Sequence, residues 1–302
     1  MSRIEEALEK AAQLRNNKRG FDVPGKISAP APSMVSPTTQ YPPLTEAAVA
    51  LASPMLVTAT DPHSPSAEEY RKLKSVLVSM TQQDTFRNTL MVASSVSGEG
   101  KSITALNLAI SMAQEFDHTV LLVDADLRKP SLHTYFGLEP KLGLSDCLQG
   151  GADLGDALIK TGIGKLTLLP SGKPVRNPAE LFSSQRMKEL IQDMKYRYPD
   201  RYIIIDTPPV LLFAETLSLS YLVDGVVFVV REGMASVQNI SDALGNLKGS
   251  LVLGIVYNDV KEESLDSRYY YYNYGARAGT VPGGNGGAAA RKGLFGRLFT
   301  RG

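Results

Sequence analysis

The sequence of 302 residues is short of several residue types, and each shortage excludes a class of protein. A single cysteine, Cys147, excludes an internal disulfide framework and fits a reducing compartment. Three scattered histidines argue against a zinc site. No apolar run approaches the roughly 18 residues that a membrane span needs. The net charge of +1 provides no field that would attract nucleic acid, whereas an apolar content of 43% is enough for a core.

The first 65 residues contain little that would build a domain. Residues 1–18 place apolar side chains on one helical face, which predicts a short amphipathic helix. They lack the apolar core of a signal sequence, so we expect a cytoplasmic protein. Residues 19–65 hold half of the 18 prolines and are expected to form a linker, although the more apolar stretch 47–58 is able to pack on the core.

A core domain is expected at residues 66–262, followed by a tail at 263–302. In the core, short apolar runs rich in β-branched residues alternate with helical stretches. This pattern is typical of an α/β fold, with a parallel sheet covered by helices on both faces. The expected strands are 89–95, 119–126, 165–171, 202–208, 225–231 and 251–258, and the expected helices are 66–82, 101–116, 178–197 and 235–248.

The stretch ASSVSGEGKS (93–102) lies between the first expected strand and a helix. It follows the phosphate-loop pattern G-x-x-x-x-G-K-[ST], with serine in place of the first glycine. Gly98 and Gly100 let the backbone curl so that successive N–H groups point at phosphates. Lys101 can reach the β- and γ-phosphates, and the Ser102 hydroxyl can hold Mg²⁺. An ordinary tight turn also explains the glycines, but the flanking strand and helix favour the phosphate loop.

Two other expected strands end in carboxylates. Asp206 follows three isoleucines, and Asp124 and Asp126 follow VLLV. In an open parallel sheet the ligand lies at the carboxyl ends of the strands, where Asp206 suits a Mg²⁺ shell and Asp124 can accept a proton from a hydroxyl. The structural alternatives are a helix-capping role for Asp206 and a surface pair between the other two aspartates and Arg128.

Five tyrosines occupy six positions near the C-terminus: Tyr269, Tyr270, Tyr271, Tyr272 and Tyr274. Tyrosine favours strands, but four in succession would point to both faces, and the flanking residues are turn formers. The glycine-rich residues that follow cannot build a core, so we expect a disordered tail. Such a tail is free to present each hydroxyl in turn, which indicates that these hydroxyls are substrates.

The last stretch, RKGLFGRLFTRG (291–302), combines apolar side chains at helical spacing with four basic residues. The pattern predicts an interfacial helix in weak contact with a membrane surface. A disordered basic tail or a protein-docking peptide explains it equally well.

Together these motifs resemble those of the bacterial tyrosine kinases (BY-kinases), the autokinases of exopolysaccharide and capsule biosynthesis. That family belongs to the P-loop ATPases that include the chromosome-partitioning and division-site ATPases. SGEGKS resembles its Walker A motif, LLVDADLR its Walker A-prime motif and IIIDTPP its Walker B motif. NPAELFSSQRM (177–187) resembles another stretch of the family. The likeness covers about residues 62–274, and the N-terminal SRIEEALEKAAQLR resembles an exosortase-associated subgroup.

The resemblance implies an ATP- and Mg²⁺-dependent tyrosine autokinase that phosphorylates its own tyrosine cluster and regulates exopolysaccharide polymerisation or export. It implies that Asp124 is the base or hydroxyl-orienting group. The implied catalytic residues are Lys101, Asp124, Asp126 and Asp206. The implied Mg²⁺ contacts are Ser102, Asp124 and Asp206. The implied nucleotide contacts are Gly98, Glu99, Gly100, Lys101, Ser102, Ile103 and, for adenine, Asn258.

The resemblance also implies partners. EEYRKLK (68–74) resembles the E-x-x-R-x-x-R contact that closes subunits of this family into a ring, with Glu68 and Arg71 matching and Lys74 replacing the second arginine. Lysine cannot form a bidentate fork with a carboxylate, and a solvated helix face with local ion pairs is the alternative. The implied activator is a membrane chain-length determinant, a polysaccharide co-polymerase, acting in trans and recruiting the protein to the inner face of the plasma membrane.

Two other functions share the same phosphate site. One is a partitioning-type ATPase switch that binds partners according to its nucleotide state. Val96 stands where those ATPases carry their signature lysine, which argues against it. The other is a scaffold of polysaccharide assembly that binds nucleotide without turnover.

Overall fold

A computed structural model of the protein describes residues 45–46, 53–82 and 85–261. The expected N-terminal helix, most of the expected linker, the tyrosine cluster and the basic stretch 291–302 lie outside the described residues.

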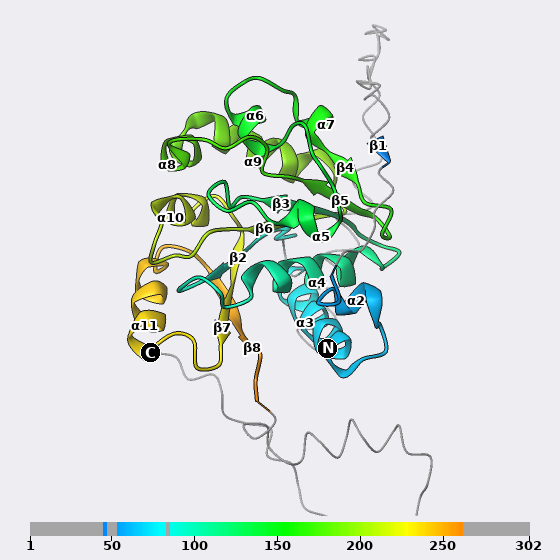
Figure 1. Cartoon of the computed structure of the whole chain (residues 1–302), viewed down its shortest axis with the longest axis vertical. Coiled ribbons are helices and arrows are strands. Elements are labelled where there is room, and N and C mark those ends of the chain that lie inside the picture. Colours follow the sequence, from blue (N-terminus) through cyan, green and yellow to red (C-terminus); the bar gives the residue numbers. More distant parts are fainter. Residues whose placement is uncertain (1–44, 47–52, 83–84, 262–302) are drawn as a thin grey trace, which may run out of the picture. The chain divides into compact units, whose positions relative to one another are not determined.

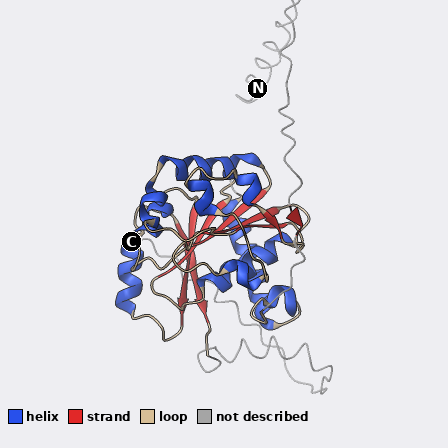
Figure 2. Ribbon diagram, turned by 45° about the horizontal axis from the view of Figure 1, so that its top comes forward, coloured by secondary structure: helices blue, strands red, loops and turns tan. Residues whose placement is uncertain are grey.

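The described residues form one eight-stranded sheet in the order β1-β4-β5-β3-β6-β2-β7-β8 (Figures 1 and 2). All neighbouring strands are parallel except β4 and β5. The expected parallel sheet is confirmed, and the short strand β4, which the sequence did not predict, adds one antiparallel pairing near one edge. A short connection with Gly162 and Gly164 at positive φ joins β4 to β5, and only antiparallel strands can be joined so tightly. The strands are β1 (Thr45–Glu46), β2 (Thr89–Ser94), β3 (Thr119–Asp124), β4 (Ile159–Lys160), β5 (Leu166–Leu169), β6 (Arg201–Asp206), β7 (Gly225–Arg231) and β8 (Val252–Asn258).

Helices cover both faces of the sheet, as expected (Figure 1). One face carries α2 (Val57–Thr60), α3 (Pro65–Thr81), α4 (Lys101–Ala113) and α5 (Leu132–Tyr135). The other carries α6 (Leu144–Leu148), α7 (Leu154–Ala157), α8 (Pro178–Ser183), α9 (Gln185–Arg197), α10 (Ala214–Ser220) and α11 (Val237–Asn246). In the described part of the chain, no helix has the length and apolarity to cross a membrane.

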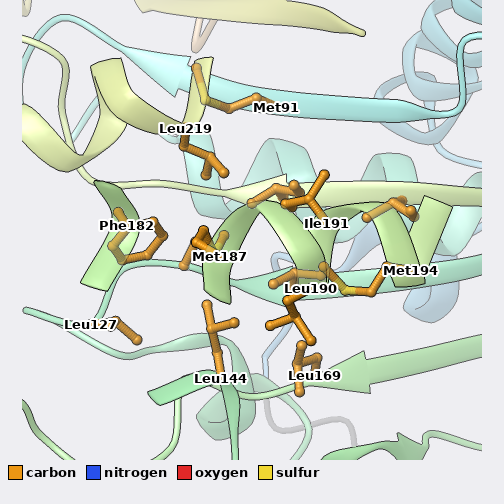
Figure 3. Close-up of a cluster of buried hydrophobic side chains, with 14 of the residues drawn as sticks. Met91, Leu127, Leu144, Leu169, Phe182, Met187, Leu190, Ile191, Met194 and Leu219 are labelled. Atoms are coloured by element: carbon orange, nitrogen blue, oxygen red, sulfur yellow. The ribbon is translucent and has the colours of Figure 1, made fainter. Parts of the chain in front are cut away.

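The apolar runs of the central strands contribute side chains to two hydrophobic clusters, one on each face of the sheet. Successive side chains of a strand point to opposite faces, so Tyr202 and Ile204 of β6 join one cluster while Ile203 and Ile205 join the other. Figure 3 shows the second cluster, where α9 contributes Met187, Leu190, Ile191 and Met194. Their spacing places all four on one helical face, which is why α9 packs on the sheet with its polar face outward.

Several helical expectations need correction. The helix expected at 178–197 is two helices, because Ser184 is extended and its hydroxyl accepts a hydrogen bond from the Met187 N–H at 3.2 Å, capping α9. The helix expected at 101–116 ends at Ala113, and the strand expected at 119–126 ends at Asp124. The short helices α5, α6, α7 and α10 have four to seven residues, too few for a periodic pattern to identify them.

The end of the expected linker belongs to the core. Leu56 is fully buried at the start of α2. The Thr58 N–H donates to Asn107 Oδ1 at 3.1 Å, and Asn107 Nδ2 donates to the Met55 carbonyl at 2.9 Å. Asn107 lies on α4, so residues 53–60 are attached to the central helix of the domain. The described part of the more apolar stretch 47–58 therefore packs on the core, as its composition allowed.

Replacing Leu56 by alanine should test this attachment. We expect Leu56→Ala to lower the free energy of unfolding by about 2–5 kcal/mol, because it leaves a cavity under α2. Met55 is its neighbour and is 60% exposed, so Met55→Ala should change the free energy by less than about 0.5 kcal/mol. Urea unfolding of both variants makes the measurement. Equal effects would show that residues 53–60 do not pack on the core.

Candidate functional site

The loop between β2 and α4 has a backbone that only glycine accommodates easily. Gly98 and Gly100 have φ values of 88° and 87°. A Cβ atom on Gly100 would also lie 2.1 Å from Asn258 Nδ2. Gly100 is the N-cap of α4 and provides no side chain to bond the first N–H groups of the helix. These N–H groups are therefore available to an anion, as in a phosphate loop.

The serine that replaces the first glycine of the loop pattern has a structural partner. Ser95 Oγ donates to Glu99 Oε2 at 2.7 Å, and the Val96 N–H donates to the same oxygen at 2.8 Å. The Glu99 side chain is fully buried, so it braces the loop from within. The resemblance had placed Glu99 only among the nucleotide contacts. Ile103, in the first turn of α4, has a partly buried side chain that packs against the core.

Lys101 lies between Asp206, the last residue of β6, and Asp126, which follows the end of β3. Its Nζ atom is 3.5 Å from Asp126 Oδ2, 3.9 Å from Asp206 Oδ1 and 3.3 Å from Ser102 Oγ. These side chains lie at the carboxyl edge of the sheet, as the sequence predicted. The structure thus brings four of the predicted site residues into one cluster.

Asp206 is fully buried, and neither of its carboxylate oxygens has a hydrogen-bond partner among the described residues. Burial raises the pKa of Asp206 to about 6, while the Lys101 ammonium opposes that rise. A buried carboxylate without hydrogen bonds is unfavourable, and the Lys101 ammonium at 3.9 Å offsets only part of the effect of burial. The donor set therefore fits a hard cation held by Asp206 and the Ser102 hydroxyl.

No group of three or more His, Cys, Asp or Glu side chains that would hold a metal unaided occurs in the described ranges. Mg²⁺ at nucleotide sites is usually held by one or two carboxylates together with phosphate oxygens and waters. Asp206 with Ser102 meets that requirement.

Asp124 is buried beside Asp206, its register partner on the adjacent strand. Its carboxylate accepts N–H bonds from Asp126 at 3.2 Å and from Ser131 and Leu132 at 3.1 Å each. Burial, with a contribution from the Asp206 charge, raises the pKa of Asp124 to about 7. A carboxyl group with this pKa is able to exchange a proton near neutral pH. Asp124 also holds the loop that follows β3 in place.

Arg128 does not pair with Asp124 or Asp126, so the alternative of a surface Asp–Arg pair is wrong. Its guanidinium pairs with Glu215 of α10, whose side chain is 2% exposed, and lies 4.5 Å from the centre of the Phe213 ring. This contact ties the loop after β3 to the start of α10. Glu215 lies 87 positions after Arg128 in the sequence, so no local pattern predicted this pair.

The residues expected at a subunit contact have local partners in this chain. Arg71 Nε donates to Glu68 Oε2 at 2.7 Å, and Arg71 Nη1 donates to the Pro62 carbonyl at 2.7 Å. Lys74 Nζ lies 2.7 Å from Glu115 Oε1. These pairs agree with the alternative of a helix face with local ion pairs. The ring contact stays a prediction.

A sheet that holds a glycine cradle, a helix start and a lysine between two buried carboxylates is the arrangement of a P-loop nucleotide-binding domain. Residues 90–273 match the family described as the CobQ/CobB/MinD/ParA nucleotide binding domain. Since that match covers more than half of the chain, the protein belongs to this family.

Relatives narrow the class further. The chain is 37% identical over 220 residues to tyrosine-protein kinase YwqD of Bacillus subtilis, covering 72% of this chain and 90% of that protein. It is 34% identical over 220 residues to the putative tyrosine-protein kinase EpsB of Ralstonia nicotianae, but spans only 28% of that protein. The kinase domain of Escherichia coli tyrosine kinase ETK superposes with a TM-score of 0.65 at 27% identity, covering 70% of this chain and 82% of that one.

The protein is therefore a member of the bacterial tyrosine kinase family, and the resemblance of its motifs to that family is confirmed. These relatives favour the kinase over the partitioning-type ATPase switch. The exosortase-associated subgroup stays a prediction.

Gly100 provides a direct test of the loop. We expect Gly100→Ala to weaken nucleotide binding at least about tenfold and to lower the free energy of unfolding by more than about 1 kcal/mol, because the side chain meets both a left-handed backbone and Asn258. The control is Gly245→Ala in α11, where a Cβ meets nothing within 4 Å and should stabilise by about 0.5–1 kcal/mol. Nucleotide titration and urea unfolding provide the readouts, and unchanged binding in Gly100→Ala would refute the assignment.

The raised carboxyl pKa values should make the stability of the nucleotide-free protein depend on pH. Folding raises the pKa of Asp124 and Asp206 from an ordinary 3.8 to about 7 and about 6. Between the ordinary pKa and the raised pKa of each group, the folded state binds more protons than the unfolded state. The free energy of unfolding should therefore fall as pH rises through about 4 to 7. Asp206→Asn should raise stability at about pH 8 and flatten this slope.

Urea unfolding at several pH values makes this measurement. Asp242→Asn is the matched control, because Asp242 is exposed and should leave the slope unchanged. A slope in Asp206→Asn identical to that of the wild type would contradict the assignment.

Proposed function

We propose that this protein is an ATP- and Mg²⁺-dependent tyrosine autokinase that phosphorylates the tyrosines at 269–274 and regulates exopolysaccharide polymerisation or export. The observation that carries the proposal is the position of Lys101. It directly follows the glycine loop between β2 and α4, and its Nζ atom lies 3.5 Å from Asp126 and 3.9 Å from Asp206. The kinase names of the relatives and the tyrosine cluster support the choice of phosphoacceptor.

In this proposal the triphosphate of the substrate ATP binds the N–H groups of the loop and the Lys101 ammonium. Ser102 and Asp206 would hold Mg²⁺, with Asp124 close to them. The ion, when bound, would neutralise charge on the phosphate oxygens. Asp126 keeps Lys101 at the edge of the sheet through their 3.5 Å contact.

Transfer requires a tyrosine oxygen to attack the γ-phosphorus of ATP. The bond between that phosphorus and the β,γ-bridging oxygen breaks, and ADP leaves with the bonding electrons. Asp124 accepts the phenolic proton or orients the hydroxyl. Its pKa of about 7 suits this role, because a base works best when its pKa lies near the working pH.

The tyrosine cluster follows the strand that ends at the site. Asn258, the last residue of β8, donates from Nδ2 to the Glu99 carbonyl at 2.9 Å, so the chain leaves the sheet beside the loop. About ten residues separate Asp259 from Tyr269 and span at most about 35 Å when extended. This length permits transfer within one subunit or to a neighbour.

The proposed partners follow from the family. A membrane polysaccharide co-polymerase would activate the kinase in trans and hold it at the inner face of the plasma membrane. A second copy would pair through Glu68, Arg71 and Lys74 in a ring. Residues 291–302 would add weak contact with anionic lipid.

The test is incubation of the purified full chain with Mg-ATP, with and without the cytoplasmic segment of a candidate activator, followed by mass spectrometry of residues 262–302. We expect phosphate on residues 269–274 in the wild type. Lys101→Met and Asp124→Asn should each reduce it at least about a hundredfold. Lys188→Met on the exposed face of α9 is the matched control and should behave as the wild type.

ATP hydrolysis without phosphate on residues 269–274, even with the activator segment present, would contradict the autokinase. That result would favour the ATPase switch. Nucleotide binding without hydrolysis would favour the scaffold.

A further inference from the structure

The ends of β7 and β8 hold the phosphate loop from its outer side. Arg231, the last residue of β7, donates from Nη1 to the Gly98 carbonyl at 3.4 Å. Asn258, the last residue of β8, donates to the next carbonyl, that of Glu99, at 2.9 Å. Two consecutive carbonyls of the loop are thus directed toward the same pair of strand ends.

The direction of these carbonyls determines the direction of the N–H groups. In a trans peptide the C=O of one residue and the N–H of the next point in opposite directions, and the described residues contain no cis peptide. The Gly98 carbonyl faces Arg231, so the Glu99 N–H points away from it. By the same argument, Asn258 orients the Gly100 N–H. N–H groups of this kind form the anion-binding concavity of a phosphate loop.

Arg231 has a second contact that Asn258 lacks. Its Nε and Nη2 atoms lie 2.8 Å and 2.6 Å from Asp259 Oδ2. Asp259 has a φ of 52°, the single positive value for a non-glycine residue in the described ranges. It is also the residue at which the chain turns away from β8 toward the tyrosine cluster. One guanidinium therefore joins the phosphate loop to the point where the C-terminal segment leaves the sheet.

The position of this pair argues against a role in stability. The Arg231 and Asp259 side chains are 40% and 61% exposed. Ion pairs in such exposed positions contribute little to folding. A change at Arg231 should therefore affect the loop and the following segment without weakening the core.

We propose that Arg231 is a positioning residue of the phosphate site, which directs the Glu99 N–H toward the bound phosphates and, through Asp259, sets the direction in which the C-terminal segment leaves β8. The inference rests on the proposed function only for the use of that segment as substrate. Its effect on the loop concerns phosphate binding and is independent of transfer.

The first test is direct binding of Mg-ADP and of adenosine to the full chain, with the urea midpoint measured in parallel. We expect Arg231→Ala to weaken Mg-ADP binding about tenfold, to leave adenosine binding unchanged and to keep the midpoint of the wild type. Arg231→Lys keeps the charge but cannot span both acceptors, so it should recover less than half of the lost affinity. Arg87→Ala is the control, because Arg87 is exposed and precedes the amino end of β2, whereas the phosphate loop follows its carboxyl end.

Unchanged Mg-ADP binding in Arg231→Ala would overturn the role in the loop, and so would the following results. Equal losses for Mg-ADP and adenosine, or full recovery by Arg231→Lys, would mean that the residue contacts the nucleoside or acts only by its charge. A midpoint that falls with the affinity, or failure of Arg231→Ala to fold, would mean a structural role.

Asp259→Asn tests the second half of the inference. It leaves the bond from Arg231 to Gly98 available but removes the charge of the pair. We expect Mg-ADP binding within about twofold of the wild type and tail phosphorylation about three- to tenfold slower at saturating Mg-ATP. Phosphorylation at the wild-type rate would overturn the link to the C-terminal segment. If the wild type itself places no phosphate on the tail, the proposed function and this link both fail, while the Mg-ADP titrations still decide the role in the loop.

Discussion

The charge balance between Lys101 and the carboxylates at the edge of the sheet is the constraint on which the rest of the site depends. Asp124 and Asp206 are buried neighbours, and such groups persist only with compensation. Backbone N–H groups compensate Asp124, whereas the Lys101 ammonium that faces Asp206 lies 3.9 Å from its Oδ1. The site therefore has a surplus of buried negative charge that a cation would relieve. Burial raises the pKa of both carboxyl groups, and neighbouring carboxylates add to the rise.

The strand order produces this balance. β6 lies between β3 and β2, so Asp206 is in register with Asp124 on one side and with Val92 on the other. The loop after β2 then begins beside the carboxylates and brings Lys101 to them at the start of α4. A strand order that separated β3 from β6 would place the same residues too far apart to share one lysine. The chemistry of the site is thus a consequence of parallel strands ending at one edge.

The other side of the loop depends on β7 and β8. Their last residues, Arg231 and Asn258, bond carbonyls that the loop turns outward, and Asp259 continues the contact to the start of the C-terminal segment. On one side of the loop lie Lys101 and the carboxylates. On the other side, hydrogen bonds from Arg231 and Asn258 hold the loop carbonyls. This division explains how a glycine-rich backbone keeps one conformation while its N–H groups stay available.

The sequence by itself determined the alternation of strands and helices, the glycine loop, and the lysine and aspartates at the strand ends, because each is a local pattern of burial or spacing. It also predicted the six long strands to within about two residues. Only the tertiary structure decided the distant partners: Glu215 for Arg128, and Gly98 with Asp259 for Arg231. The antiparallel β4 and the bonds of Met55 and Thr58 to Asn107 also required it. Contacts between residues far apart in the chain follow from the order of strands and the packing of helices, and a local pattern carries no record of either.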